Sequence, residues 1–119
     1  MRFLSIVKSA ETQEPPPQAL LDAIARLTED SIRDGSLVQT GGLGGTSSAG
    51  RVRISKGKLI VTDGPFTEAK EVIGGYAVLE ATSREEALEN ARIFMQLHQQ
   101  HWPGWEGECE VRELVFLAP

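Results

Sequence analysis

The sequence predicts an α+β fold in which two helices pack on one face of an antiparallel sheet. The chain has 119 residues, of which 40% are hydrophobic and 24% are charged, the profile of one soluble globular domain spanning residues 1–119. Apolar residues recur with the strand period or the helix period in the order strand, helix, strand, hairpin, strand, helix, strand. Two βαβ units joined by a hairpin are typical of a ferredoxin-like sheet.

The first βαβ unit is predicted over residues 2–40. Residues 2–8 alternate as a strand does, and a helical pattern begins at Gln18, after a run of prolines that the first turn of a helix tolerates. Gly35 is the expected left-handed cap at the end of this helix. Residues 36–40 form the next strand. The apolar face of the helix consists of Leu20, Ile24 and Leu27, flanked by Leu21 and Thr28.

The second half begins with a glycine-rich loop over residues 41–50. The segments 51–55 and 58–62 are predicted to pair as a hairpin around Lys56-Gly57, and residues 73–80 form another strand. Ser83 and Glu86 have the spacing of a capping box, so the second helix starts there and ends by Trp102-Pro103-Gly104. Residues 109–116 are the last predicted strand.

Such a sheet leaves one face without helices. An apolar sheet face is stable only when something covers it, and a chain of this length has little core to spare. We therefore expect two sheets to pack face to face in a homodimer, burying more than about 1,200 Å² in total.

Composition excludes several classes of protein. Cys109 is the single cysteine, which rules out an internal disulfide and a cysteine-rich zinc site. The net charge of −5 argues against nucleic-acid binding, and no apolar stretch is long enough to span a membrane. Without a secretory pattern at the start, a cytoplasmic protein is expected. The four basic residues of the hairpin are either solvated edge charges or a patch for an anion or an acidic partner.

Several stretches carry a family resemblance: MRFLSIVKS, GGLG, RVR, VTDGPFTEAKE, IGGYAVLEATSREEA and ECEVREL. The chain resembles the YCII-related proteins, in particular the subgroup named for its Asp-Gly-Pro-Phe motif. The resemblance implies a ferredoxin-like fold and a dimeric α+β barrel, and it places some similar proteins beside extracytoplasmic-function sigma factors. It also implies a histidine–aspartate pair for acid–base chemistry, for which Asp63 is the candidate aspartate; neither His98 nor His101 lies in a matching segment.

Two roles are possible for the Asp63 side chain. An aspartate before Gly-Pro can bond to backbone N–H groups of its own turn, while in a cleft its carboxylate could serve as a base. The candidate ligand-binding residues are Gly42, Leu43 and Gly44 in a mobile loop at the barrel mouth, together with Lys70 and Tyr76. Lys70 belongs to the site only if it faces the same cleft as Asp63; otherwise it is a surface charge.

His98 lies on the apolar helix face, where a lone histidine is usually a satisfied core or edge residue. His98 and His101 have the spacing of a metal-binding pair, but no third ligand stands at a recognisable distance, so neither a metal nor another cofactor is expected. Trp102 and Trp105 are expected to pack in the core or at an interface. The glycine-rich loop lacks the spacing of a nucleotide-binding fingerprint, and Cys109 lies inside a strand, which does not favour nucleophilic catalysis.

Two functions remain open from the sequence. The first is a small-molecule binder, or an acid–base enzyme without a cofactor, whose pocket lies in a dimeric barrel. The second is a non-enzymatic interaction module tied to sigma-factor-type transcription control, in which the basic hairpin and the tryptophan segment meet a partner. A pocket that contains Asp63 favours the first function, and a filled barrel favours the second.

Overall fold

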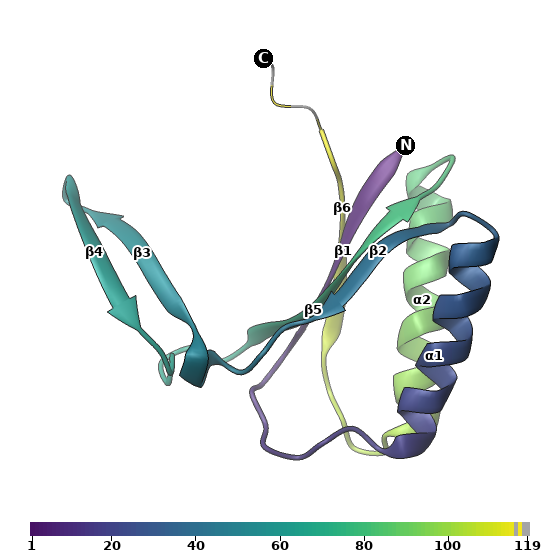
Figure 1. The fold of residues 1–119 in the computed structure, drawn as a ribbon, viewed down its shortest axis with the longest axis horizontal. Helices are drawn as coiled ribbons and strands as arrows, with labels where there is room; N and C mark the ends of the chain where they lie inside the picture. Colours follow the sequence, from purple (N-terminus) through teal and green to yellow (C-terminus); the bar gives the residue numbers. More distant parts are fainter. Residues whose placement is uncertain (116, 118–119) are drawn as a thin grey trace.

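The computed structural model describes residues 1–115 and 117 of the chain. Figure 1 shows its helices and strands. In chain order they are β1 (Arg2–Ser9), α1 (Gln18–Arg33), β2 (Leu37–Gly42), a short 3₁₀ helix (Thr46–Ser48), β3 (Gly50–Ser55), β4 (Lys58–Asp63), β5 (Val72–Glu80), α2 (Arg84–His101) and β6 (Glu108–Glu113).

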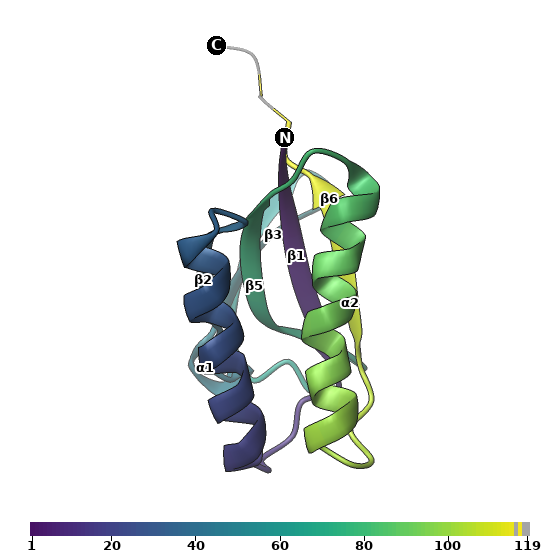
Figure 2. The same ribbon diagram turned by 90° about the vertical axis from the view of Figure 1, so that its right-hand side faces the viewer.

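Four strands form one antiparallel sheet in the order β2-β5-β1-β6, and β3 pairs with β4 in a separate hairpin. Both helices lie side by side on one face of the sheet (Figure 2). This arrangement confirms the predicted α+β class and is consistent with the ferredoxin-like order of elements.

The local signals in the sequence explain most element boundaries. Gly35 has φ +83 immediately after α1, as a left-handed cap requires. The Ser83 hydroxyl accepts a hydrogen bond from the Glu86 N–H at 3.1 Å, whereas the Glu86 carboxylate accepts from the Thr82 hydroxyl. The capping box is therefore only half formed. The last strand ends at Glu113, earlier than the predicted 109–116, and Phe116 lies outside the described residues.

The core between sheet and helices is small. Its buried cluster consists of Phe3, Leu79, Ala81 and Ala87, at the end of the sheet where the chain begins. Leu20 is the largest side chain that is fully buried. Because two members of the cluster are alanines, only part of the space between the two layers is filled.

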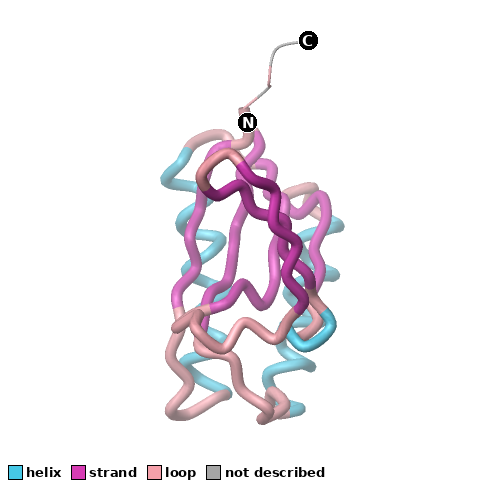
Figure 3. The backbone as a smooth tube through the Cα atoms, turned by 90° about the vertical axis from the view of Figure 1, so that its left-hand side faces the viewer, coloured by secondary structure: helices cyan, strands magenta, loops and turns pink. Residues whose placement is uncertain are grey.

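The β3–β4 hairpin stands apart from this core. Figure 1 shows it on the side of the sheet away from the helices, and Figure 3 views the molecule from that side. The turn at Lys56-Gly57 has positive φ at both residues, which is the geometry of a tight hairpin turn. The radius of gyration is 16.1 Å, against about 13.5 Å for a compact domain of this length. A single chain is thus more extended than a self-sufficient domain.

Candidate functional site

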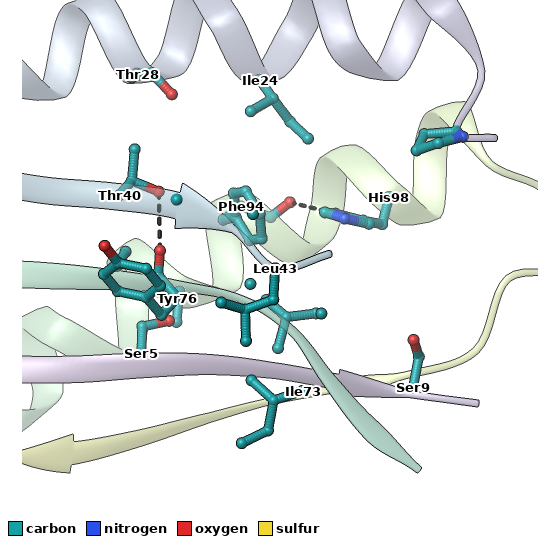
Figure 4. Close-up of a pocket in the computed structure, with 18 of the residues that line it drawn as sticks. Ser5, Ser9, Ile24, Thr28, Thr40, Leu43, Ile73, Tyr76, Phe94 and His98 are labelled. Carbon is teal, nitrogen blue, oxygen red and sulfur yellow. Dashed lines mark hydrogen bonds between the residues drawn. The ribbon is translucent and has the colours of Figure 1, made fainter. Parts of the chain in front are cut away.

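A cavity of about 680 Å³ separates the sheet from the two helices. Figure 4 shows side chains from both layers converging on it, including Ile24 and Thr28 from α1 and Phe94 and His98 from α2. The volume lies within the range of about 300–1,000 Å³ that is typical of small-molecule sites.

Small residues on the sheet account for the cavity. Ser5, Ala77 and Gly75 lie on the face toward the helices, because they alternate in register with the buried pair Phe3 and Leu79. Gly75 has no side chain, and the side chains of Ser5 and Ala77 are too small to reach α1 or α2. The space that larger aliphatic residues would fill is left open.

His98 is the titratable group set most deeply in the cavity wall. Its side chain is only 7% exposed, and its Nδ1 lies 3.1 Å from the backbone carbonyl oxygen of Phe94. The imidazole packs against the rings of Phe94 and Trp105, with centroids 4.8 and 4.7 Å away, and Trp105 stacks on Trp102. Four rings thus form one cluster at this end of the cavity.

The surroundings of His98 determine its protonation. Burial lowers the pKa of His98 below its usual value, although the hydrogen bond to the Phe94 carbonyl acts in the opposite direction. A carbonyl oxygen can only accept, so Nδ1 carries the hydrogen and Nε2 carries the lone pair of the neutral ring. Within residues 1–115, no side-chain or backbone group donates to Nε2.

The lowered pKa of His98 predicts that the protein loses stability in mild acid. As the pH falls below about 6.5, the unfolded chain binds a proton at this histidine before the folded chain does. The free energy of unfolding should therefore decrease with falling pH until the lower folded-state pKa is passed. We expect His98→Phe, which keeps an aromatic ring, to reduce this dependence in urea titrations between pH 5 and 7.5. An unchanged pH profile would contradict the assignment.

Thr46 forms hydrogen bonds to two other loop segments beside the cavity. Its N–H and hydroxyl donate to the Glu11 carboxylate at 2.7 and 2.6 Å, and the hydroxyl accepts from the Phe66 N–H at 3.3 Å. The hydroxyl and N–H of Thr46 hold the pKa of Glu11 below its usual range. The Gly64 N–H donates to the Ala49 carbonyl at 2.8 Å. These hydrogen bonds hold the Asp-Gly-Pro-Phe segment against the glycine-rich loop that lines the cavity.

Comparison with known proteins places the chain in a family. The family model of the YCII-related domain matches residues 1–93. The chain belongs to the YCII-related family. An uncharacterised protein of Rhizobium meliloti (strain 1021) is 31% identical to it over 113 residues, which cover 95% of this chain and 86% of that protein.

Four of the predicted site residues of this YCII-related chain line the cavity. Gly42 does so from the last position of β2, Leu43 and Gly44 from the loop that follows, and Tyr76 from β5. The Tyr76 hydroxyl accepts a hydrogen bond from the Gln39 side chain at 3.0 Å.

Asp63 and Lys70 lie elsewhere in the YCII-related fold. Both are exposed, and neither lines the cavity. Asp63 ends β4 in the hairpin, and across residues 1–115 its carboxylate accepts no hydrogen bond. A role for Asp63 in chemistry therefore stays a prediction. The nearby Glu68 pairs with Arg51, whose guanidinium lies 3.7 Å from the centre of the Phe66 ring.

His98 is a site residue whose place in the pocket is not predictable from the sequence. Its position on the apolar face of α2 was visible, but Trp105 reaches it only because the chain turns back after the helix. Burial raises the pKa of the Cys109 thiol in β6, which does not favour a nucleophile. In the described part of the chain, no cluster of three His, Cys, Asp or Glu side chains could hold a metal ion.

No helix of the described residues is long and apolar enough to cross a membrane.

Proposed function

We propose that the protein binds a small, mostly apolar molecule in the cavity between its sheet and its helices. The single observation that supports this function is the cavity itself, which has the volume of a ligand site and a lining of aliphatic and aromatic side chains with a few polar groups. The Ser9 and Thr28 hydroxyls are among these polar groups. A folded core with no binding role would gain stability by filling this space.

A thermal-shift screen of small molecules tests the proposal. A ligand at about 100 times its dissociation constant should add roughly 2.7 kcal/mol to the stability. Thr28→Trp should abolish this shift, because Thr28 lines the cavity and indole would occupy it. Glu29→Trp, on the exposed side of the same helix, is the matched control and should retain it. A shift that persists unchanged in Thr28→Trp would place the ligand outside the cavity.

The same assay tests the acid–base role of Asp63, since its carboxylate accepts no hydrogen bond from its own turn in the described residues. Asp63→Asn should remain folded, with a change in stability within about 0.5 kcal/mol, because the side chain is exposed. Ligand binding by the cavity of one protomer should also be unchanged. A loss of ligand-induced shift in Asp63→Asn would show that the carboxylate reaches the site in the assembled protein, as the acid–base hypothesis requires.

We also propose that the protein is a homodimer in which the hairpin packs on a second copy of the chain. One hairpin face consists of the cross-strand pairs Val52–Val61 and Ile54–Leu59, which are 70%, 73%, 77% and 73% exposed respectively. Soluble monomers rarely leave such a contiguous apolar patch in water, and an isolated two-stranded hairpin is at best marginally stable.

Two further observations favour a second copy as the partner. The sheet face away from the helices presents Leu4, Ile6 and Val78 on adjacent strands, so the same chain offers an apolar surface for the hairpin. The hairpin contains four of the chain's 12 basic residues and only one of its 17 acidic residues. The rest of the molecule is therefore strongly acidic, and a second copy attracts the hairpin by opposite charge.

A further inference from the structure

We propose that His98 Nε2 is the polar anchor of the cavity, and that the ligand is an uncharged aromatic molecule with a hydroxyl group that donates to this nitrogen. The inference rests on the proposed function and names the class of ligand. Its physical basis is the unpartnered acceptor on a side chain that is more than nine-tenths buried and lines the cavity.

The hydrogen bond at Nδ1 determines what Nε2 can bind. Because Nδ1 donates to the Phe94 carbonyl, Nε2 of the neutral imidazole can only accept. No fully buried side-chain nitrogen or oxygen of the described residues lacks a hydrogen-bond partner, so Nε2 retains some accessible surface at which a ligand can reach it. A ligand that donates to Nε2 gains a hydrogen bond that an otherwise identical ligand without a donor cannot make. The complementary group is an O–H, such as that of a phenol.

The charges along the cavity wall indicate that this ligand is neutral. Among the described residues that line the cavity, none is a lysine or an arginine, so an anion finds no counter-charge. Two carboxylates line it: that of Glu11 already accepts two hydrogen bonds from Thr46, and that of Glu14 is exposed to solvent. An ammonium group would lose its hydration without a free partner beside His98.

The rings around His98 indicate that the ligand is flat. Phe94, Trp102 and Trp105 form a cluster with the imidazole and also line the cavity. Aromatic faces and edges pack favourably on another ring. A fused bicyclic phenol places a ring against this cluster while its hydroxyl reaches Nε2, and it fits readily within about 680 Å³.

Isothermal titration calorimetry with 1-naphthol, 1-methoxynaphthalene and 1-naphthylmethylamine tests the inference. The wild-type protein should bind 1-naphthol about 10-fold or more tightly than the methyl ether, which has the same rings but no donor. In His98→Phe this ratio should fall to near 1, since the ring packing remains and the acceptor is lost. His101→Phe, on the same helix but outside the cavity lining, should keep the wild-type ratio.

A second measurement uses only the wild-type protein, so it stays informative if His98→Phe does not fold. Nitrogen-15 NMR of the imidazole should show a protonated Nδ1 and an unprotonated Nε2, with only the Nε2 resonance moving strongly when 1-naphthol is added.

Equal affinities for the alcohol and the ether, tighter binding of the amine, or an unmoved Nε2 resonance would each overturn the inference. If these results accompany a ligand-induced thermal shift that Thr28→Trp abolishes, the proposed function stands and only the ligand class fails. If no ligand gives such a shift, the proposed function fails as well.

Discussion

Val61→Asp is expected to convert the proposed dimer to monomers at micromolar concentration. Val61 lies on the apolar face of the hairpin, directly opposite Val52. A carboxylate there would be buried against the second copy without a partner, at a cost of about 2–4 kcal/mol for each contact, as at interface hot spots. In a two-fold symmetric dimer the substitution occurs twice, so the dissociation constant should rise by at least about 10³-fold.

Ile60→Asp is the matched control for this substitution. Ile60 is the preceding residue of the same strand, and it lies opposite Arg53 on the other face of the hairpin. This variant should remain dimeric in analytical ultracentrifugation and light scattering. A Val61→Asp dimer as tight as the wild type would exclude the hairpin from the interface. A wild-type protein that is itself monomeric would contradict the dimer and favour an interaction module whose hairpin binds a different protein.

Gly64→Ala should destabilise the fold by about 1–3 kcal/mol, the usual cost of forcing extra atoms into a packed site. A Cβ atom at this position would lie 1.6 Å from the Thr46 carbonyl oxygen and 3.2 Å from that of Ala49. The cause is close approach of two backbone segments, since Gly64 is not among the glycines with positive φ. Because Thr46 belongs to the loop beside the cavity, ligand binding should weaken together with stability.

Gly74→Ala tests whether this cost is specific to the Asp-Gly-Pro-Phe turn. Gly74 is exposed in β5, and a Cβ atom there would meet nothing within 4 Å. We expect a change within about 0.5 kcal/mol in urea denaturation at the same protein concentration. Equal effects of the two substitutions would mean that the turn can move away from Thr46 without cost.

The element order of the fold was predictable because local signals coincide with the tertiary structure. Gly35 ends a helix whose apolar residues already define its buried side, and Lys56-Gly57 is a turn between two short β segments. For the hairpin, amino-acid composition alone gives a wrong expectation of its surface. Its basic residues suggest a solvated element, yet Val52, Ile54, Leu59 and Val61 alternate with them and share one face. The alternation was visible in the sequence, but the lack of a covering element in the same chain was not.

The site was less predictable because it depends on contacts between distant segments. Gly42 ends β2, and Leu43 and Gly44 follow it directly, so their place at the end of the sheet could be anticipated. Asp63 looked like a cavity residue from its motif, but docking of the next residues on Thr46 leaves it on the surface of the protomer. The cavity arises from small residues on the sheet, which in sequence are indistinguishable from ordinary strand positions.

The most direct test of a small-molecule site is a crystal structure of the protein saturated with 4-bromo-1-naphthol, using the anomalous signal of bromine. The proposal predicts one strong bromine peak for each protomer, between the sheet and helices α1 and α2, with the naphthol hydroxyl at hydrogen-bond distance from His98. Bromine peaks confined to the molecular surface, or a cavity without ligand at saturating concentration, would contradict it.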